Sequence, residues 1–379
     1  MNPLPQQANR RGTTPNPLLK QEGALKSPGS RAPSYFRRGR ADVRLGVVIL
    51  CFSLTFPETP LISLEGETQG TTYHIKYQDN RQRNVKQSID SLLTEIDKCL
   101  SIYRADSELS QFNRGMNHRF QRPYFYPVLK KSDEVFRATD GAFDPTVLPL
   151  VDAYGFGPKK PVATDVVNVD SLLQFVGLQN ITFDSTTVQK KKKNVQLDFN
   201  GIAQGYSVDV LAKFLEAKGI TNYMVEIGGE IRTKGQKGNG QFWTVGITNP
   251  LHPDQLYVTL KLVDQAMPGR ATPGRAMTTA GNYRNHYVSD GQVFSHIINS
   301  KTGMMEQSEL LSVTVLAADA ITADAYDTAF MVMGLEKTKR FLKNRPDLDA
   351  FLMYTDTNGQ LQTYATEGLK HLQPTGSRR

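Results

Sequence analysis

The feature that most constrains the fold is a strand–turn–helix–strand unit between residues 197 and 230. Apolar residues at three- and four-residue spacing predict an amphipathic helix, and Gly219 is a natural C-terminal stop for it. These apolar residues are Ile202, Tyr206, Val210, Leu211, Phe214 and Leu215. A short strand over 197–199 precedes the helix, and a second strand follows it and ends in paired glycines. The unit predicts strands and helices packed on one another.

The N-terminus of this helix is rich in small and polar residues, among them Asp198, Asn200, Gly201 and Gly205. Free backbone N–H groups are therefore expected to face a loop without bulky side chains. Such a helix end binds phosphate or pyrophosphate, and an adjacent carboxylate or carbonyl can hold the metal that accompanies it. Glycines that only permit tight packing would explain the same residues, so spacing alone leaves both interpretations open.

The charge of the chain is unevenly distributed. The net charge is +8 over 379 residues, and residues 1–44 contribute +7 of it, with nine Lys or Arg and two acidic residues. The remainder carries a net charge of only +1. A nearly neutral folded part does not provide the basic surface that nucleic-acid binding needs, so we expect no nucleic-acid partner.

The N-terminal part predicts a tail followed by an export segment. Residues 1–44 are rich in Pro, Gly, Ser and Arg and are expected to be disordered. Residues 45–60 begin with an uncharged apolar run directly behind several arginines, as in a secretory signal or a membrane anchor. A buried strand is the alternative for this run. If this segment directs export, we expect the protein at the bacterial inner membrane, facing the periplasm, or in the cell envelope. Residues 61–373 are expected to form the folded domain.

The rest of the chain predicts an α+β fold, with helices packed against largely antiparallel sheets. Residues 72–77 alternate like a half-buried strand, whereas 85–100 and 127–138 have helical periodicity. Cys99 lies on the first of these helices and is expected to be a small core residue. The four lysines at 190–193 are expected to form a solvated hairpin loop.

One segment has the chemistry of a cation site. Asp324 and Thr328 are four residues apart at the start of a predicted helix, so their oxygens project from one face. A carboxylate and a hydroxyl suit Mg²⁺, which prefers oxygen ligands and leaves room for a substrate phosphate. Capping of the helix start by Asp and Thr is the alternative.

Three other segments are less specific. His296 is the best-placed candidate base, although a lone histidine in a strand is more often structural. Asp144, followed by Pro145 and Thr146, indicates a turn or a helix start. Residues 277–283 are expected to form a polar turn between strands without chemistry of its own.

Together, these segments resemble the FAD:protein FMN transferases, the ApbE family. The resemblance covers about 270 residues in ordered blocks. The blocks are 66–73, 101–113, 141–146, 198–209, 227–229, 278–281, 295–298, 301–303 and 323–328. A single block would be weak, but their order and spacing make a specific signal, which implies an ApbE-like two-lobed domain.

The resemblance implies transfer of FMN from FAD to a Thr or Ser hydroxyl of a target protein, with release of AMP. It implies Mg²⁺ on the pyrophosphate, held by Asp324, Thr328 and the Gly201 carbonyl, with Asp327 nearby. His296 matches the histidine proposed to activate the acceptor hydroxyl. The implied FAD contacts are Gln69, Tyr103, Ala142, Phe143, Asp144, Asp198 and Gln204.

Some positions depart from the family pattern, and two other functions stay open. Gln204 stands where Lys or Glu is common, Ala280 where Ser is frequent, and Asn299 with Ser300 where Asp-Pro is usual. Loss of charge at Gln204 keeps open a periplasmic protein that binds FAD without transferring it. The other alternative is an FAD pyrophosphatase, which uses water as the acceptor and gives FMN and AMP.

Overall fold

The computed structural model describes residues 59–158, 168–262, 275–282, 286–289, 292–295, 297–305 and 308–372. The chain divides into two units, Met1–Glu58 and Thr59–Arg379, and everything described belongs to the second. The predicted tail, nearly all of the apolar segment and His296 lie outside the described residues. Within the part described, no helix is long and apolar enough to span a membrane.

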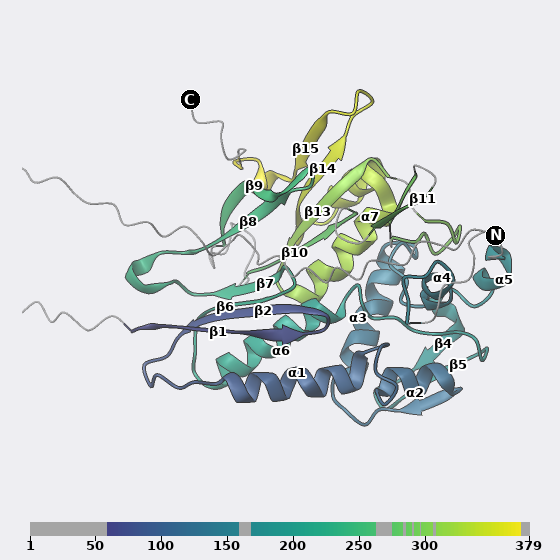
Figure 1. Cartoon of the computed structure of the whole chain (residues 1–379), viewed down its shortest axis with the longest axis horizontal. Helices are drawn as coiled ribbons and strands as arrows, with labels where there is room; N and C mark the ends of the chain where they lie inside the picture. Colours follow the sequence, from purple (N-terminus) through teal and green to yellow (C-terminus); the bar gives the residue numbers. More distant parts are fainter. Residues whose placement is uncertain are drawn as a thin grey trace, which may run out of the picture. The chain divides into compact units, whose positions relative to one another are not determined.

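The centre of the fold is one eight-stranded sheet with the strand order β1–β2–β6–β7–β10–β13–β14–β15 (Figure 1). All of its neighbouring strands are antiparallel. The strands are β1 (Leu61–Thr68), β2 (Thr71–Gln78), β6 (Asn222–Ile227), β7 (Glu230–Lys234), β10 (Arg275–Gly281), β13 (Leu310–Ala317), β14 (Asp349–Thr355) and β15 (Leu361–Ala365). The prediction of a largely antiparallel α+β fold is therefore confirmed.

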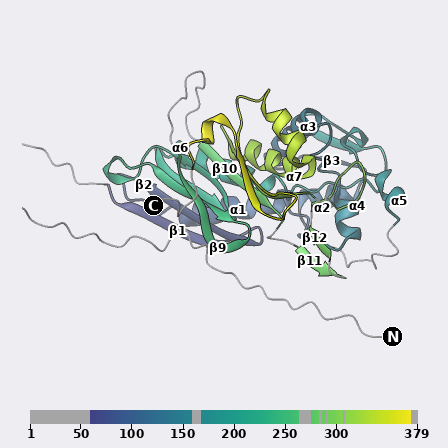
Figure 2. The same cartoon turned by 90° about the horizontal axis from the view of Figure 1, so that it is seen from above.

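Helices cover one face of this sheet, and a hairpin covers the other. The helices are α1 (Lys86–Leu100), α6 (Ala203–Ala217) and α7 (Ala320–Leu342), and the hairpin consists of β8 (Trp243–Asn249) and β9 (His252–Leu262) (Figure 2). Successive strand residues point to opposite faces. Accordingly, Ala276 of β10 joins the core beneath α1 and α6, whereas Met277 joins the core beneath β8 and β9.

The second part of the fold lies beside α7, at the right of Figure 1. It contains α2 (Glu108–Arg114), α3 (Phe125–Ala138), α4 (Leu148–Ala153) and α5 (Val169–Leu173), with β3 (Asn117–Arg119), β4 (Ile181–Phe183) and β5 (Thr187–Lys190). The three strands form a small sheet in the order β3–β5–β4. β11 (His286–Ser289) pairs with β12 (Gln292–Ser295). One large apolar core joins α3 of this part to α7, so α7 contacts both parts.

The periodic helices are confirmed, with small shifts at their ends. α6 covers the helix expected from the 197–230 unit, and Gly219 follows it with φ 78°, as a C-terminal glycine should. α1 and α3 match the two other predicted helices. Cys99 is fully buried in the core, as expected.

The strand predicted over residues 197–199 is wrong, and the reason is a side chain. The Asn113 amide donates to the Leu197 carbonyl and accepts from the Leu197 N–H, both at 2.8 Å. Asn113 thus satisfies the backbone groups that a neighbouring strand would have satisfied. Residues 197–199 belong to no strand in the structure.

Two further predictions about loops are wrong. Residues 275–281 form strand β10 of the main sheet, where a polar turn had been expected from residue 277 onward. Lys190 is buried at the end of β5, although Lys191, Lys192 and Lys193 are exposed in a loop as expected. Lys190 Nζ donates to the carbonyls of Asn113 and Val195, and burial lowers its pKa to about 8.

Candidate functional site

The crossing of α6 and α7 lies at the centre of the candidate site. Gly205, in the first turn of α6, donates its backbone N–H to Asp324 Oδ2 at 2.8 Å. A Cβ atom on Gly205 would lie 2.4 Å from the carbonyl oxygen of Ala320, so only glycine permits this approach. The crossing therefore places Asp324 against the N-terminus of α6.

Some of the N–H groups that were expected to be free at the N-terminus of α6 donate hydrogen bonds within the protein. Besides Gly205, Ala203 donates its N–H to the Phe199 carbonyl at 2.8 Å. The prediction of free amides is thus wrong for two of the first three residues of α6. A carboxylate of the protein, that of Asp324, occupies part of the position expected for a phosphate.

The four residues predicted to surround a metal are close to one another in pairs. A Cβ atom on Gly201 would lie 3.1 Å from Thr328 Oγ1, so the residue-201 backbone and the Thr328 hydroxyl are neighbours. Thr328 Oγ1 lies 3.4 Å from Asp327 Oδ1. The charge of Asp324 acts on Asp327. α7 and the loop before α6 thus assemble oxygen groups that are far apart in sequence.

Burial desolvates the carboxyl groups of both Asp324 and Asp327. Burial raises the pKa of Asp324 to about 7, against the hydrogen bond from Gly205. Burial, and then the charge of Asp324, raise the pKa of Asp327 well above its usual range. Asp327 Oδ2 is buried and has no hydrogen-bond partner among the described residues. An orphaned carboxylate oxygen beside a second carboxylate fits a hard cation such as Mg²⁺.

Carboxylates alone do not complete a metal site here. Among the residues that the structure describes, no three His, Cys, Asp or Glu side chains come together as metal ligands. A cation at Asp324 would therefore need the hydroxyl of Thr328 and a backbone carbonyl, the donors that the sequence predicted. The metal roles themselves stay predictions.

Two tight turns meet the start of α6. Gln69 and Gly70 connect β1 to β2 with φ values of 49° and 74°. Gln69 Nε2 donates to Ser207 Oγ of α6 at 2.7 Å, while its Oε1 is buried and has no partner among the described residues. Gly228, in the turn between β6 and β7, would bring a Cβ within 3.2 Å of Gln204 Oε1. Gln69 and Gln204 thus lie where these turns reach α6.

Asp198 and Tyr103 form a second group of predicted residues. Asp198 is buried and accepts a hydrogen bond from the Asn200 N–H at 2.8 Å. Burial raises its pKa to about 6, and the charge of Asp152 adds to this. Tyr103 interacts with Asp198 and Asn200 and is 63% exposed. An exposed aromatic ring beside a buried carboxylate suits a heteroaromatic ligand with polar edges.

The turn of residues 142–144 is stabilised by hydrogen bonds between Asp144 and Thr146. Asp144 Oδ1 accepts hydrogen bonds from the N–H and the hydroxyl of Thr146, at 2.8 and 2.6 Å. Burial raises the Asp144 pKa to about 6. Asp198 donates its N–H to the Pro145 carbonyl at 2.7 Å, so this turn is tied to the Asp198 group. Phe143 lies beside Gly201, whereas the Asp144 oxygen bound by Thr146 is already occupied.

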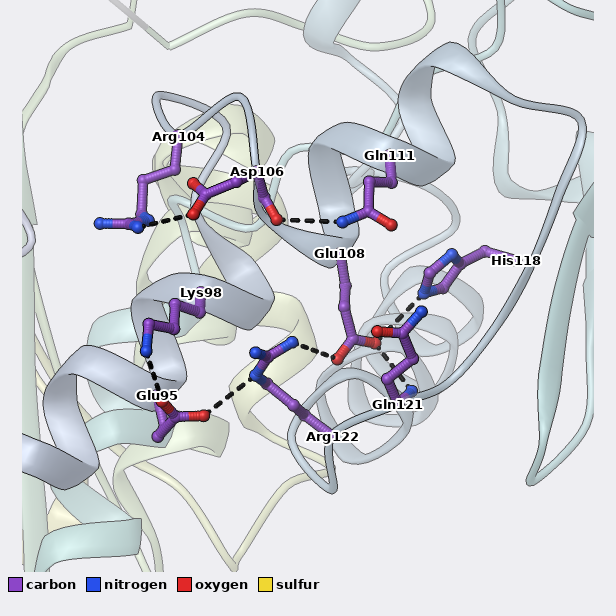
Figure 3. Close-up of polar contacts among 9 residues, drawn as sticks. All are labelled: Glu95, Lys98, Arg104, Asp106, Glu108, Gln111, His118, Gln121 and Arg122. Atoms are coloured by element: carbon purple, nitrogen blue, oxygen red, sulfur yellow. Dashed lines mark hydrogen bonds and ion pairs between the residues drawn. The ribbon is translucent and has the colours of Figure 1, made fainter.

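The loop over 101–107, which carries Tyr103, is stabilised by local contacts. Ser107 Oγ donates to the Ser101 carbonyl at 2.6 Å, and Tyr103 donates its N–H to Ser101 Oγ at 3.1 Å. Figure 3 shows the ion pair between Arg104 and Asp106 in this loop, at 2.9 Å. The exposed ring of Tyr103 therefore stands on a constrained backbone.

Glu108, directly after this loop, is the centre of a polar network (Figure 3). Its side chain is fully buried and accepts hydrogen bonds from the Gln121 N–H at 3.0 Å and from Arg122 at 3.2 Å. His118 lies 3.2 Å from the same carboxylate. Arg122 also bonds Glu95 of α1 at 3.1 Å. The network joins α1, α2 and the segment after β3 beneath the Tyr103 loop.

Sequence reasoning missed two groups at the crossing. Thr278 of β10 is fully buried and interacts with Asp327, although its segment was expected to be a turn. Asp209 of α6 pairs with Arg232 of β7. A polar residue one turn after Gly205, on the buried side of the helix, was the available signal for Asp209. The catalytic prediction, His296, lies outside the described residues, and its role stays a prediction.

Comparisons with known proteins identify the family of this chain. The ApbE family model matches residues 69–352. FAD:protein FMN transferase of Vibrio cholerae is 36% identical over 324 residues, covering 82% of this chain and 92% of that protein. The enzyme of the same name from Haemophilus influenzae is 34% identical over 337 residues, with 83% and 93% covered. The structure of a His-to-Gly mutant of flavin transferase ApbE from Vibrio cholerae has a TM-score of 0.71 at 33% identity, covering 82% and 99%.

Proposed function

This chain belongs to the ApbE family and is a flavin transferase, and on that premise we propose that it moves FMN from FAD to a Thr or Ser hydroxyl of a target protein. The second product is AMP. The observation that carries this proposal is the pair of buried carboxylates of α7, Asp324 and Asp327, beside the loop before α6.

We propose that Asp324, Thr328 and the Gly201 carbonyl hold Mg²⁺, with Asp327 next to them. The burial of Asp324 and the Asp327 Oδ2 that has no partner among the described residues support this, because a bound cation would offset the cost of desolvating these oxygens. The ion would neutralise charge on the pyrophosphate of FAD. The protein's part is to hold these oxygens in a site from which water is largely excluded.

The FAD contacts are proposed from the two groups of side chains around α6. Gln69 Oε1 is a buried acceptor without a partner among the described residues, so it suits an N–H or O–H donor of the ligand. Gln204 lies in the first turn of α6, where it offers a neutral amide. Tyr103 offers an exposed ring beside Asp198. The Ala142–Asp144 turn adds Phe143, next to Gly201.

The reaction is a displacement at phosphorus. The acceptor hydroxyl oxygen forms a bond to the phosphorus on the FMN side of the pyrophosphate. The bond from that phosphorus to the bridging oxygen breaks, and AMP leaves with the electron pair. The hydroxyl proton goes to a base, for which we propose His296. Positioning and electrostatic stabilisation supply most of the rate enhancement in such transfers.

The test is an incubation of the full chain with FAD, Mg²⁺ and a flavin-acceptor domain, read by intact mass and AMP release. The proposal expects an FMN adduct on the acceptor, lost in Asp324→Ala and His296→Ala. Asp319→Ala, at the start of the same helix, is the matched control and should retain the adduct. Free FMN with AMP and no adduct would instead identify a pyrophosphatase. Bound FAD without either product would identify a binding protein.

We also propose that residues 45–60 direct export to the periplasmic side of the inner membrane. The support is the apolar run behind Arg37, Arg38, Arg40 and Arg44. Fractionation of cells that express the full chain, with and without residues 45–60, tests this. Recovery of both forms in the cytoplasmic fraction would contradict the proposal.

A further inference from the structure

Asp209 is a buried carboxylate of α6 that the proposed reaction does not use. Its Oδ1 accepts a hydrogen bond from the Ala320 N–H at 3.1 Å, and its Oδ2 accepts one from the Ile321 N–H at 2.9 Å. Arg232 of β7 forms an ion pair with the same carboxylate. One side chain therefore joins α6 to the first turn of α7 and to the central sheet.

These bonds account for the free amides at the start of α7. The first residues of a helix have N–H groups without a partner inside the helix. In α7, Asp209 accepts those of Ala320 and Ile321, and Asp319 accepts that of Thr322 at 3.1 Å. The Ala323 N–H then donates to the Asp319 carbonyl. Only Asp319 belongs to the chain segment of α7 itself, so the other cap comes from a different helix.

The arrangement is reciprocal. Asp209 of α6 accepts from the first turn of α7, while Asp324 of α7 accepts from Gly205 in the first turn of α6. The two contact residues of each helix, Gly205 with Asp209 and Ala320 with Asp324, are four apart and share a face. Two such points of contact fix the position of one helix along the other as well as its rotation.

Arg232 favours the charged form of Asp209, which accepts the hydrogen bonds from the first turn of α7. Burial raises the pKa of the Asp209 carboxyl, whereas the charge of Arg232 and the two N–H bonds lower it. The ion pair thus favours the anion, which can accept several hydrogen bonds at once. Arg232 is itself largely buried and lies on β7, in the interior of the sheet.

We propose that Asp209, held by Arg232, is a positioning residue that sets the register of α7 on α6 and so holds Asp324 and Thr328 in place for the metal. This inference rests on the proposed function, since it takes the metal ligands from it. Asp209 does not touch the metal or FAD in this proposal. Its effect is transmitted through the first turn of α7, one turn before Asp324.

The experiment measures Mn²⁺ affinity of the full chain with FAD present, by electron paramagnetic resonance, together with the unfolding temperature and amide hydrogen exchange at Ala320 and Ile321. Asp209→Asn should weaken Mn²⁺ binding by about tenfold to hundredfold, as for other residues that orient metal ligands. Exchange at Ala320 and Ile321 should be faster, because an amide group cannot accept from both and also face Arg232.

Asp319→Ala is the matched control. It removes a cap from the same turn of α7 but leaves α6 and α7 joined. It should lower the unfolding temperature and leave the Mn²⁺ affinity unchanged. Arg232→Lys keeps the positive charge and is expected to fold, so it replaces Asp209→Asn should that variant fail to fold. It should weaken Mn²⁺ binding several-fold, and wild-type affinity in Arg232→Lys would overturn the proposal.

The outcomes separate this inference from the proposed function. Mn²⁺ binding by wild type and its loss in Asp324→Ala support the metal assignment by themselves. If Asp209→Asn then binds Mn²⁺ as wild type does, or if Asp319→Ala weakens it equally, the positioning role is wrong. If Asp324→Ala binds Mn²⁺ as tightly as wild type, the metal assignment is wrong, and the inference falls with it.

Discussion

Two carboxylate groups meet at the crossing of α6 and α7, and they differ in how fully their charges are satisfied. Asp209 has an arginine and two backbone N–H donors. Asp327, on the other helix, has a buried oxygen without a partner among the described residues, and the charge of Asp324 acts on it. Removing a partner from a satisfied buried carboxylate costs stability, whereas an unsatisfied buried carboxylate itself costs stability and is available to a cation.

The largest expected effect comes from breaking the satisfied group. Asp209→Ala leaves Arg232 largely buried without its carboxylate and leaves two amides of α7 without an acceptor. We expect a loss of about 3–5 kcal/mol in the free energy of unfolding, measured by urea titration without metal. A loss below about 1 kcal/mol, the size expected for an exposed ion pair, would show that the two groups do not differ in this way.

A smaller effect is expected from Gly205→Ala, which changes the contact between α6 and α7. The added Cβ would meet the Ala320 carbonyl at 2.4 Å, so α7 must shift away from α6. We expect a loss of about 1–3 kcal/mol in stability, as for other overpacked sites. Mn²⁺ affinity should also fall, because Asp324 moves with α7. Lys213→Ala, at an exposed position of α6, is the control and should change neither quantity.

The unsatisfied group should respond in the opposite direction. Asp327→Asn keeps the shape of the side chain and replaces a buried carboxyl, whose Oδ2 has no partner among the described residues, with a neutral amide. The metal-free protein should gain about 1 kcal/mol in stability, while flavin transfer falls. Thermal unfolding without Mg²⁺ measures the change in stability, and the formation of the FMN adduct measures the change in flavin transfer. Destabilisation of the metal-free protein would mean that Asp327 is as well satisfied as Asp209.

A further expected effect is a dependence of stability on pH. The folded-state pKa of Asp324 is raised from its ordinary value of 3.8 to about 7, so between these values the folded state binds more protons than the unfolded state. Stability of the metal-free protein should therefore fall as pH rises through this window. Asp324→Asn should reduce the slope of this profile, and so should Mg²⁺. A profile that rises with pH, unchanged in Asp324→Asn, would contradict the raised pKa.

Much of the candidate site could be predicted because its local geometry follows from short-range rules. The four-residue spacing of Asp324 and Thr328 places both on one face of α7, as expected. The ordered blocks also sufficed to indicate the ApbE family, which the comparisons confirm.

The errors concern groups whose partners are distant in sequence. Leu197 lies outside any strand because Asn113, 84 residues earlier, satisfies its backbone groups. Lys190 is buried because two carbonyls and the ring of Phe112 compensate its charge. Thr278 belongs to a central strand because β10 is paired with β7 on one side and with β13 on the other. No local pattern contains these partners.

The sequence alone determined the elements and the chemical types at the site: an amphipathic α6 ended by Gly219, a carboxylate and a hydroxyl on one face of α7, and turns that require glycine. Only the tertiary structure decided which groups meet. Gly205 and Asp324 are 119 residues apart, and Asp209 meets the start of α7 from 111 residues away. Propensity and periodicity act within a few residues, whereas burial, desolvation and the pairing of amides with carboxylates depend on which surfaces pack together.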